Sequence, residues 1–386
     1  MALLLRNVIE RLDQMYDPSW ADEWDAVGLV CGDPEQQVRK ILFAVDPAPL
    51  VVDEAKEWGA DLIVVHHPLL LKAVSSVAAT TPKGRILHDL IRHECALFTA
   101  HTNADAPAYG VNESLALALG VQEPQVIVAD AGEGLDKLVT FVPHENAEAV
   151  RAAITDAGAG AIGDYDSATF TTVGEGRFRP LEGATPAIGR VGDVEVVAES
   201  RIESVFPRNK RRQVVAAMKA VHPYEEPAYD VFELADLPGT GAAARGSGRI
   251  GKLASPMTLR DFATQVHAAL PATAHGVRVG GDPDAMVETV AVTSGAGDFL
   301  LETVLGAGAD VYVTSDLRHH RAGEFLEHGG PALVDVAHWA AEWTWLPVVE
   351  RRLVEALTTV GDLTLEGDTV ETRVSTMCTD PWTLRI

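Results

Sequence analysis

Residues 61–68 read Asp-Leu-Ile-Val-Val-His-His-Pro, an apolar run that ends in two histidines and a proline. A continuous run of this kind is typical of a strand buried on both faces of a parallel sheet. Ligands bind at the carboxyl ends of strands in open α/β sheets, so His66 and His67 stand where function concentrates. Taken alone, however, the pair is more simply explained as one packed and one solvated histidine.

The chain up to about residue 130 alternates strands with helices around this run. Further strands are expected at 39–45 and 96–99, and helices at 47–58, 84–94 and 112–119. Regular alternation of this kind predicts α/β layering.

The order of expected helices and strands changes between about residues 131 and 240. The expected order is a strand at 138–142, a helix at 144–157, a hairpin region at 168–197, a helix at 208–221 and a strand at 228–234. This β-α-β-β-α-β order is typical of a ferredoxin-like α+β domain. The Gly- and Ala-rich stretch 238–251 that follows is interpreted as a linker.

The α/β pattern returns after residue 252. Helices are expected at 258–270 and 298–306, strands at 287–294, 310–314 and 332–336, and one long helix at 339–357 that Pro347 interrupts. The sequence therefore predicts an α/β protein with a two-lobed body and an inserted ferredoxin-like domain. The expected bounds are 1–130 for the first lobe, 131–240 for the insert and 241–386 for the second lobe.

Composition narrows the classes of function. The 386 residues carry a formal charge of −25, which disfavours general binding of nucleic acid. No apolar run approaches the roughly 18 residues that a membrane span needs. The three cysteines are far apart and form neither a disulfide framework nor a zinc-knuckle spacing, so a reducing cytoplasm is the expected location.

A second polar cluster follows the strand expected at 96–99. His101, Asn103 and Asp105 stand there, and they would meet His66 and His67 at the same rim of the sheet. An Asx-type turn would explain Asn103 and Asp105 but would leave His101 unexplained.

Two more clusters follow strands near the other end of the chain. His338 and Glu342 are four residues apart at the head of a helix, so both project from one face, as a chelating pair or an ordinary surface pair would. Asp316 and His320 follow the strand expected at 310–314. Asn103, Asp316 and Asp335 are interpreted as residues that orient metal ligands or bind substrate.

The residue types indicate the kind of ion. Histidine nitrogens mixed with carboxylates suit Zn, Fe, Mn, Co or Ni better than Ca or Mg. Three histidines and two carboxylates exceed what one open catalytic zinc uses. Because carboxylates bridge metals, the set His66, His67, Asp105, His338 and Glu342 predicts two divalent ions about 3.5–4 Å apart.

The same motifs resemble a known family. HHP at 66–68, HTNAD at 101–105, TSD with HH at 314–320 and DVAHWAAE at 335–342 are similar to the GTP cyclohydrolase I type 2 homologs, also called Ngg-interacting-factor-three-like or dinuclear metal-centre proteins. The resemblance implies the five ligands above, with Asp105 and Glu342 as bridges, and a toroidal homohexamer. The middle segment, with HPYEEPAYD at 222–230, resembles the P-II/CutA-like insert of longer members.

Several positions depart from the family pattern. WDAVGLVCGD at 24–33 has Ala26 where the family has Asn, Ser315 replaces a Gly, and Val336-Ala337 replace Ala-Gly. None of the five expected ligands is altered. HPYEEP itself is interpreted as a structural turn that precedes a strand.

Two classes of function follow. The first is a metal-dependent hydrolase acting on a nucleotide or related heterocycle, with GTP ring opening as the reaction that the family implies and with His101 or His320 moving protons. The chain lacks a GxxxxGK[ST] phosphate loop, so nucleotide specificity rests on the resemblance alone. The alternative is a non-catalytic metal-binding or regulatory oligomeric assembly. A nucleic-acid-binding ring is disfavoured, because only 208–212 offers a basic run.

Overall fold

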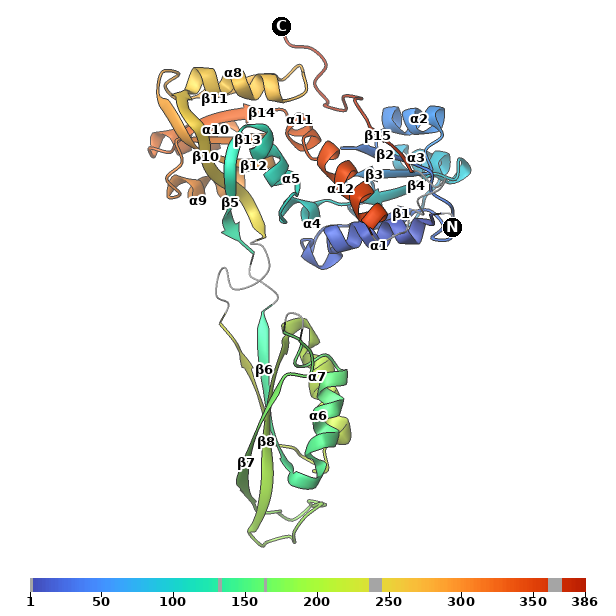
Figure 1. Ribbon diagram of the computed structural model, residues 1–386, viewed down its shortest axis with the longest axis vertical. Helices are drawn as coiled ribbons and strands as arrows, with labels where there is room; N and C mark the ends of the chain where they lie inside the picture. The colour runs from blue at the N-terminus through green and yellow to red at the C-terminus, as the bar shows by residue number, and fades with distance from the viewer. Residues whose placement is uncertain (1–2, 131–133, 163–164, 236–244, 360–369) are drawn as a thin grey trace. The chain divides into compact units, whose positions relative to one another are not determined.

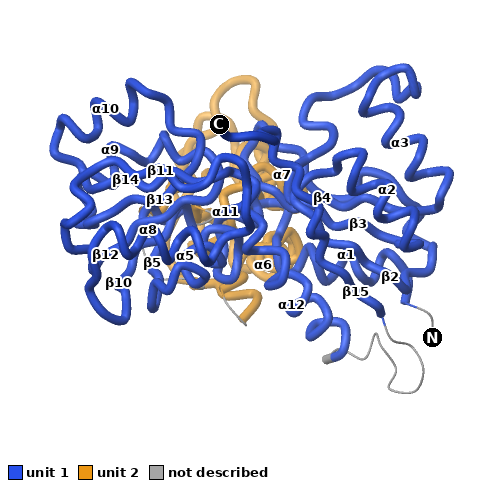
Figure 2. The backbone as a smooth tube through the Cα atoms, turned by 90° about the horizontal axis from the view of Figure 1, so that it is seen from above, with its two compact units in different colours: residues 1–130, 242–386 blue, residues 131–241 orange. Residues whose placement is uncertain are grey.

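The computed structural model describes residues 3–130, 134–162, 165–235, 245–359 and 370–386. The chain divides into two compact units, which Figure 2 shows in different colours. Unit 1 comprises residues 1–130 and 242–386, and unit 2 comprises residues 131–241. Within the described ranges, every helix is too short or too polar to traverse a lipid bilayer.

Unit 1 contains two sheets, each of which has helices on both faces (Figure 1). The strands of the first sheet are, in spatial order, β1 (Gly28–Cys31), β4 (Ala96–Thr99), β3 (Leu62–Val65), β2 (Lys40–Ala44) and β15 (Glu371–Val374). The three central strands are parallel and almost entirely buried. One face is covered by α1 (Leu5–Met15) and α12 (Leu346–Thr359), and the other by α2 (Pro49–Trp58) and α3 (Pro82–Arg92).

The second sheet has a parallel centre with antiparallel edges. Its strands are, in spatial order, β11 (Val277–Gly280), β14 (Ala332–Val336), β13 (Val311–Ser315), β12 (Met286–Ala296), β10 (Gly246–Thr258) and β5 (Val121–Ala129). One face packs against α5 (Val111–Ala118), α8 (Leu259–Ala269) and α11 (His338–Trp343), and the other against α9 (Leu301–Leu305) and α10 (His319–Glu327). Both sheets therefore confirm the α/β class.

Helix α11 joins the two cores of unit 1. Trp339 and Ala340 pack into the core of the first sheet, whereas Ala341 packs into the core of the second. The short helix α4 (Thr102–Asp105) follows the first sheet's β4. A helix that contacts both cores can present side chains to both sheets, and His338 and Glu342 lie on it.

Unit 2 has the order β6 (Leu135–Pro143), α6 (Ala147–Asp156), β7 (Thr169–Phe178), β8 (Glu195–Pro207), α7 (Arg211–Val221) and β9 (Tyr229–Glu233). The sheet order is β7-β8-β6-β9 and every pairing is antiparallel. Apolar residues of α6 and α7 pack against one face of this sheet, as Val150 and Met218 do. The arrangement confirms the ferredoxin-like order of the insert.

Two expectations about local structure were wrong. The helix expected at 339–357 is two helices, α11 and α12, separated at Thr344 and Trp345, and Pro347 lies in the first turn of α12, where proline is tolerated. In the expected linker at 238–251, residues 238–244 lie outside the described residues, but 246–251 belong to β10. The glycines do not prevent a strand there, because β5 and β12 supply hydrogen bonds on both sides.

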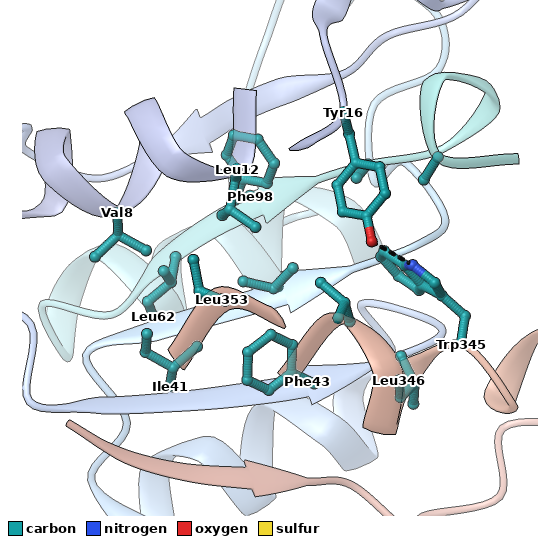
Figure 3. Packing of buried hydrophobic residues seen from close by; sticks show 14 of the residues in the cluster. Val8, Leu12, Tyr16, Ile41, Phe43, Leu62, Phe98, Trp345, Leu346 and Leu353 are labelled. Carbon is teal, nitrogen blue, oxygen red and sulfur yellow. Dashed lines mark hydrogen bonds between the residues drawn. The ribbon is translucent and has the colours of Figure 1, made fainter. Parts of the chain in front are cut away.

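The core of the first sheet contains a buried polar pair. Figure 3 shows Tyr16 and Trp345 among the apolar side chains of α1, α12 and the central strands. The indole Nε1 of Trp345 donates a hydrogen bond to the hydroxyl of Tyr16 at 3.0 Å, and both side chains are almost fully buried. The bond ties the chain after α1 to the turn that separates α11 from α12.

We expect Tyr16→Phe to lower the free energy of unfolding by about 1–3 kcal/mol, because the buried indole N–H of Trp345 loses its acceptor. Urea unfolding of the full chain measures this change. Tyr109→Phe is the control, since Tyr109 is half exposed and its substitution should change stability by less than about 0.5 kcal/mol. Equal effects of the two substitutions would contradict a role for the Tyr16–Trp345 bond.

Candidate metal centre

The carboxyl ends of the parallel strands supply the polar residues of the site. Asp46 follows β2, His66 and His67 follow β3, and His101 follows β4. Backbone N–H groups of both His66 and His67 donate to the carbonyl of Val45, which fixes the turn out of β3. In the second sheet, Gly295 lies at the end of β12, while Asp316 follows β13 and His338 follows β14.

Four histidines of this region share one arrangement, in which an oxygen accepts a hydrogen bond from Nδ1. The pairs are His66 with the Ala100 carbonyl at 2.9 Å, His67 with Asp46 at 2.7 Å, His101 with Asp25 at 2.8 Å, and His338 with Asp316 at 2.7 Å. An oxygen that accepts a hydrogen bond from Nδ1 fixes the orientation of the ring. It leaves Nε2 free to coordinate a metal ion, as in histidines that bind metals.

The carboxylate of Glu342 lies at the centre of these rings. Its Oε1 is 2.8 Å from Nε2 of His338 and 3.5 Å from Nε2 of His66, and its Oε2 is 3.1 Å from Nε2 of His67. The side chain of Glu342 is only 4% exposed. One carboxylate thus faces the ring nitrogens of three histidines that come from both sheets.

Asp105 ends α4 beside the same cluster. Its Oδ1 lies 3.8 Å from Nε2 of His66. Asp105 Oδ1 is buried without a hydrogen-bond partner, and Glu342 Oε2 is buried beside the ring nitrogen of His67 at 3.1 Å without a well-aligned hydrogen bond. Two buried carboxylate oxygens that lack a well-aligned hydrogen bond, among several ring nitrogens, fit a divalent cation, because buried polar atoms normally have partners.

Two groups of residues are positioned to bind a metal ion. In each, one potential ligand atom per residue lies within 4.8 Å of the others. The first group is His66, His67 and His101, and the second is His67, His338 and Glu342. His67 belongs to both groups, so the two positions are adjacent.

The charges of the cluster raise the pKa values of two of its histidines. Burial alone would lower the pKa of His67, but the carboxylates of Glu342 and Asp46 raise it well above its ordinary value. The same opposition, with Glu342 and Asp316 as the carboxylates, raises the pKa of His338 to about 10. Without a metal the cluster therefore holds imidazolium groups, and a metal ion would replace their protons.

The pKa values of the two carboxylates of the cluster are shifted in opposite directions. Burial would raise the pKa of Glu342, but His67, His66 and His338 hold it well below its ordinary value. Burial and the nearby charge of Glu342 raise the pKa of Asp105 to about 7. Like charges this close favour a shared cation.

Asn103 and Asp335, which were expected to orient metal ligands or bind substrate, make their hydrogen bonds to other groups. Asn103 is buried, its Oδ1 accepts from the backbone N–H of His101, and its amide donates to the Tyr16 carbonyl. Asp335 accepts from the backbone N–H of Leu317 and pairs with His275 and Arg278, and none of these partners is one of the five expected ligands.

His320 is not brought to the cluster. Its side chain is exposed on α10, where its ring packs edge-on against the ring of His319 at 5.1 Å. Within the part of the chain that the structure describes, neither group of potential ligands includes His320, and Asp105, which is also in neither group, differs from it by lying beside His66. His101, in contrast, lies 5.1 Å from His66 and 5.6 Å from His67 between ring centroids.

The sequence interpretation missed three contributors to the site. Asp46 and Asp25 hold the rings of His67 and His101. Asp46 directly follows an apolar strand, and this position was the available signal. Gly295 matters by its lack of a side chain, because a Cβ there would lie 2.9 Å from Oε1 of Glu342 and 3.2 Å from Nε2 of His338.

A cavity of about 280 Å³ opens beside the cluster. Its lining includes three aromatic residues, Trp20, Trp24 and Phe299, and four carboxylates, Asp22, Asp105, Asp130 and Glu342. Among the described residues that line it there is no lysine or arginine. Arg245 lies nearby over the ring of Trp20, but it is paired with Asp130.

Comparison with known proteins gives a consistent result. The family model described as Duf34/NIF3 (NGG1p interacting factor 3) matches residues 3–375. A protein of Mycobacterium tuberculosis named GTP cyclohydrolase 1 type 2 homolog is 50% identical over 385 residues, which are 100% of this chain and 98% of that protein. A Bacillus subtilis protein of the same name is 39% identical over 335 residues, 87% of this chain and 88% of that protein.

Solved structures agree with the sequence relatives. A Bacillus cereus protein related to NIF3 has 37% identity and a TM-score of 0.69, and the match covers 99% of both chains. A Staphylococcus aureus protein has 28% identity and a TM-score of 0.74, and the match covers 99% of this chain and 98% of that one.

Proposed function

Because the chain belongs to the Duf34/NIF3 family, we propose that its histidine–carboxylate cluster holds two divalent metal ions and that the protein is a hydrolase acting on a heterocycle. The proposed ligands are His66, His67, Asp105, His338 and Glu342. The ions are drawn from Zn, Fe, Mn, Co and Ni, because the ligands mix imidazole with carboxylate.

One observation supports this proposal above the others. Four imidazoles are held at Nδ1 by oxygen acceptors, beside two buried carboxylate oxygens without a well-aligned hydrogen bond. An ordinary buried ion-pair network would give both oxygens well-aligned hydrogen bonds. A site built to receive cations leaves them available.

The chain's own residues have separate roles in the proposed reaction. Bound divalent ions would polarise a substrate oxygen and make a water more acidic. Glu342 and Asp105 place negative charge where the cations bind. His101 also belongs to the first group of potential ligands, but the five proposed ligands leave its Nε2 to move a proton, with Asp25 orienting the ring. We assign this role to His101 because His320 is exposed on α10.

The cavity favours a ring over a phosphate as the recognised group. Trp24 and Phe299 are exposed and offer aromatic rings to a planar heterocycle, whereas Arg245 already lies over the ring of Trp20. Because no lysine or arginine is found among the described residues of the lining, the cavity offers no side-chain cation to a phosphate chain. We therefore expect the base or nucleoside to be accepted at least as well as the nucleotide triphosphate.

The test is formate release. Protein purified without an affinity tag, then loaded in turn with each of the five metals, is incubated with GTP, guanosine and guanine. We expect ring opening to release formate with at least one metal, and Glu342→Gln to reduce the rate at least 100-fold, on the order of a lost transition-state interaction. No formate from any of the three compounds with any metal would contradict the proposed ring opening.

The alternative function is a non-catalytic metal-binding or regulatory assembly. Unit 2 is a separate unit with its own core, and none of the residues of the histidine cluster belongs to it. This separation favours the alternative. It requires bound metal without turnover. The substrate assay and metal analysis of the same sample separate the two functions.

We further propose that the protein works as a toroidal homohexamer in the cytoplasm and that unit 2 is a P-II/CutA-like insert. These proposals rest on the family resemblance. Light scattering coupled to size-exclusion chromatography measures the mass, which is six times 41.2 kDa for a hexamer.

A further inference from the structure

Unit 2 contains a cavity that the proposed hydrolase does not use. Its volume is about 860 Å³, and its lining comes from β7, β8, the segment that joins them and the turn before β9. The lining includes Tyr224, Glu225 and Glu226 of the motif HPYEEP. A space of this size suits a small organic molecule rather than a single ion.

The cavity contains one buried carboxylate, that of Glu199. The residue is 7% exposed, and its Oε1 accepts a hydrogen bond from the hydroxyl of Tyr224 at 2.8 Å. A Cβ at Gly176 would lie 2.1 Å from Oε2, so the carboxylate packs against bare backbone on its other side. A buried carboxylate is costly unless a cation pairs with it, and a neutral phenol supplies no positive charge.

The arginines of the lining do not supply that cation. Arg177 pairs with Glu175 at 2.7 Å, and Arg201 pairs with Glu203 at 2.8 Å. The third arginine, Arg179, is exposed at the edge of the lining. Within the described ranges, no ion pair of Glu199 is found. The lining as a whole has five glutamates and three arginines, so the cavity attracts positive charge.

The tyrosine that contacts the carboxylate packs against a second aromatic ring of the lining. The ring centroids of Phe178 and Tyr224 are 5.6 Å apart, with the planes inclined at 59°. His222 holds Tyr224 in place, because its Nδ1 accepts from the backbone N–H of Tyr224 and its Nε2 donates to the Phe141 carbonyl. A carboxylate and aromatic rings in the lining of one cavity are a binding arrangement for an ammonium group.

The connection between β7 and β8 is hydrogen-bonded to the HPYEEP motif. The backbone N–H of Thr185 donates to the carboxylate of Glu225 at 2.9 Å, which joins the β7–β8 connection to the turn before β9. The turn expected for HPYEEP is therefore present, and it also forms one wall of the cavity. The motif shapes a pocket as well as ending a helix.

We propose that unit 2 binds an organic cation in this cavity: an ammonium group on an apolar or aromatic body, with Glu199 as its counter-ion and Tyr224 and Phe178 against it. The site is separate from the histidine cluster of unit 1. Unit 2 would then have its own ligand, which is positively charged, whereas a nucleotide is negatively charged.

The test uses three probes of one shape on the full chain. Isothermal titration calorimetry measures binding of 2-phenylethylamine, 2-phenylethanol and phenylacetate, which carry positive, zero and negative charge. We expect the amine to bind at least tenfold more tightly than the other two. Glu199→Gln should weaken the amine at least tenfold and leave the alcohol unchanged, since it removes charge and keeps shape.

A matched control and a second variant keep the result interpretable. Glu182→Gln removes an exposed carboxylate of the same lining and should change amine binding by less than threefold. If Glu199→Gln fails to fold by circular dichroism, Phe178→Leu removes one aromatic face and should also weaken the amine. Three results would overturn the proposal: binding of the amine no tighter than the alcohol, tighter binding of phenylacetate, or amine binding that is unchanged in whichever of these two variants folds.

Discussion

His338→Ala is expected to lose nearly all bound metal while the chain stays folded. The side chain supplies one ring nitrogen to the cluster and is 30% exposed, so its removal takes away a proposed ligand without opening a deep cavity in the core. Loss of a group that merely orients a ligand costs about 10–100-fold in metal affinity, so loss of the ligand itself should cost more. Elemental analysis after dialysis measures the metal content.

The controls for this variant come from the same chain. His320→Ala removes an exposed histidine of α10 and should leave the metal content unchanged. Asp316→Asn weakens the acceptor of Nδ1 of His338 and should give an intermediate loss of about 10–100-fold in affinity. Asp105→Ala should resemble His338→Ala, and full metal content in both variants would falsify the ligand assignment.

The second large effect is expected from Gly295→Ala. The added methyl group would lie 2.9 Å from Oε1 of Glu342 and 3.2 Å from Nε2 of His338, in the space where a cation would contact both. We expect the apparent affinity for Zn²⁺ to fall at least tenfold, because neither side chain can keep its place. Competition with a chelator of known affinity measures this change.

Gly308→Ala is the matched control for Gly295→Ala. Both glycines have positive φ, +64° at Gly295 and +75° at Gly308, but a Cβ at Gly308 meets nothing within 4 Å. The backbone cost of about 1–2 kcal/mol is therefore common to both variants, and only the first blocks the cluster. Equal loss of Zn²⁺ from the two variants would attribute the effect to backbone strain and not to a blocked site.

The central strands could be predicted because their signal is local. The runs that became β3 and β4 are apolar without interruption, and a parallel strand covered on both faces needs that pattern. The polar residues that follow them were recognisable for the same reason. His66, His67, His101, Asp105, His338 and Glu342 all lie at one cluster in the structure.

The edge strands had no comparable signal. β5 contains Pro124 and several polar residues, and a proline is tolerated there because the strand is the edge of its sheet. β10 begins in a glycine-rich stretch and takes its hydrogen bonds from β5 and β12. β15 pairs with β2 across more than three hundred residues of sequence, and only the folded chain reveals that pairing.

Sequence alone determined the α/β class, the ferredoxin-like order of the middle segment and the residue types that a metal centre needs, because periodicity and strand-end position are local properties. Tertiary structure decided which groups face each other. It paired His67 with Asp46 and His101 with Asp25, left His320 on the surface, and placed Glu199 in a cavity where no described residue forms an ion pair with it. Such contacts depend on distances between segments far apart in the chain, and no short stretch of sequence encodes a distance.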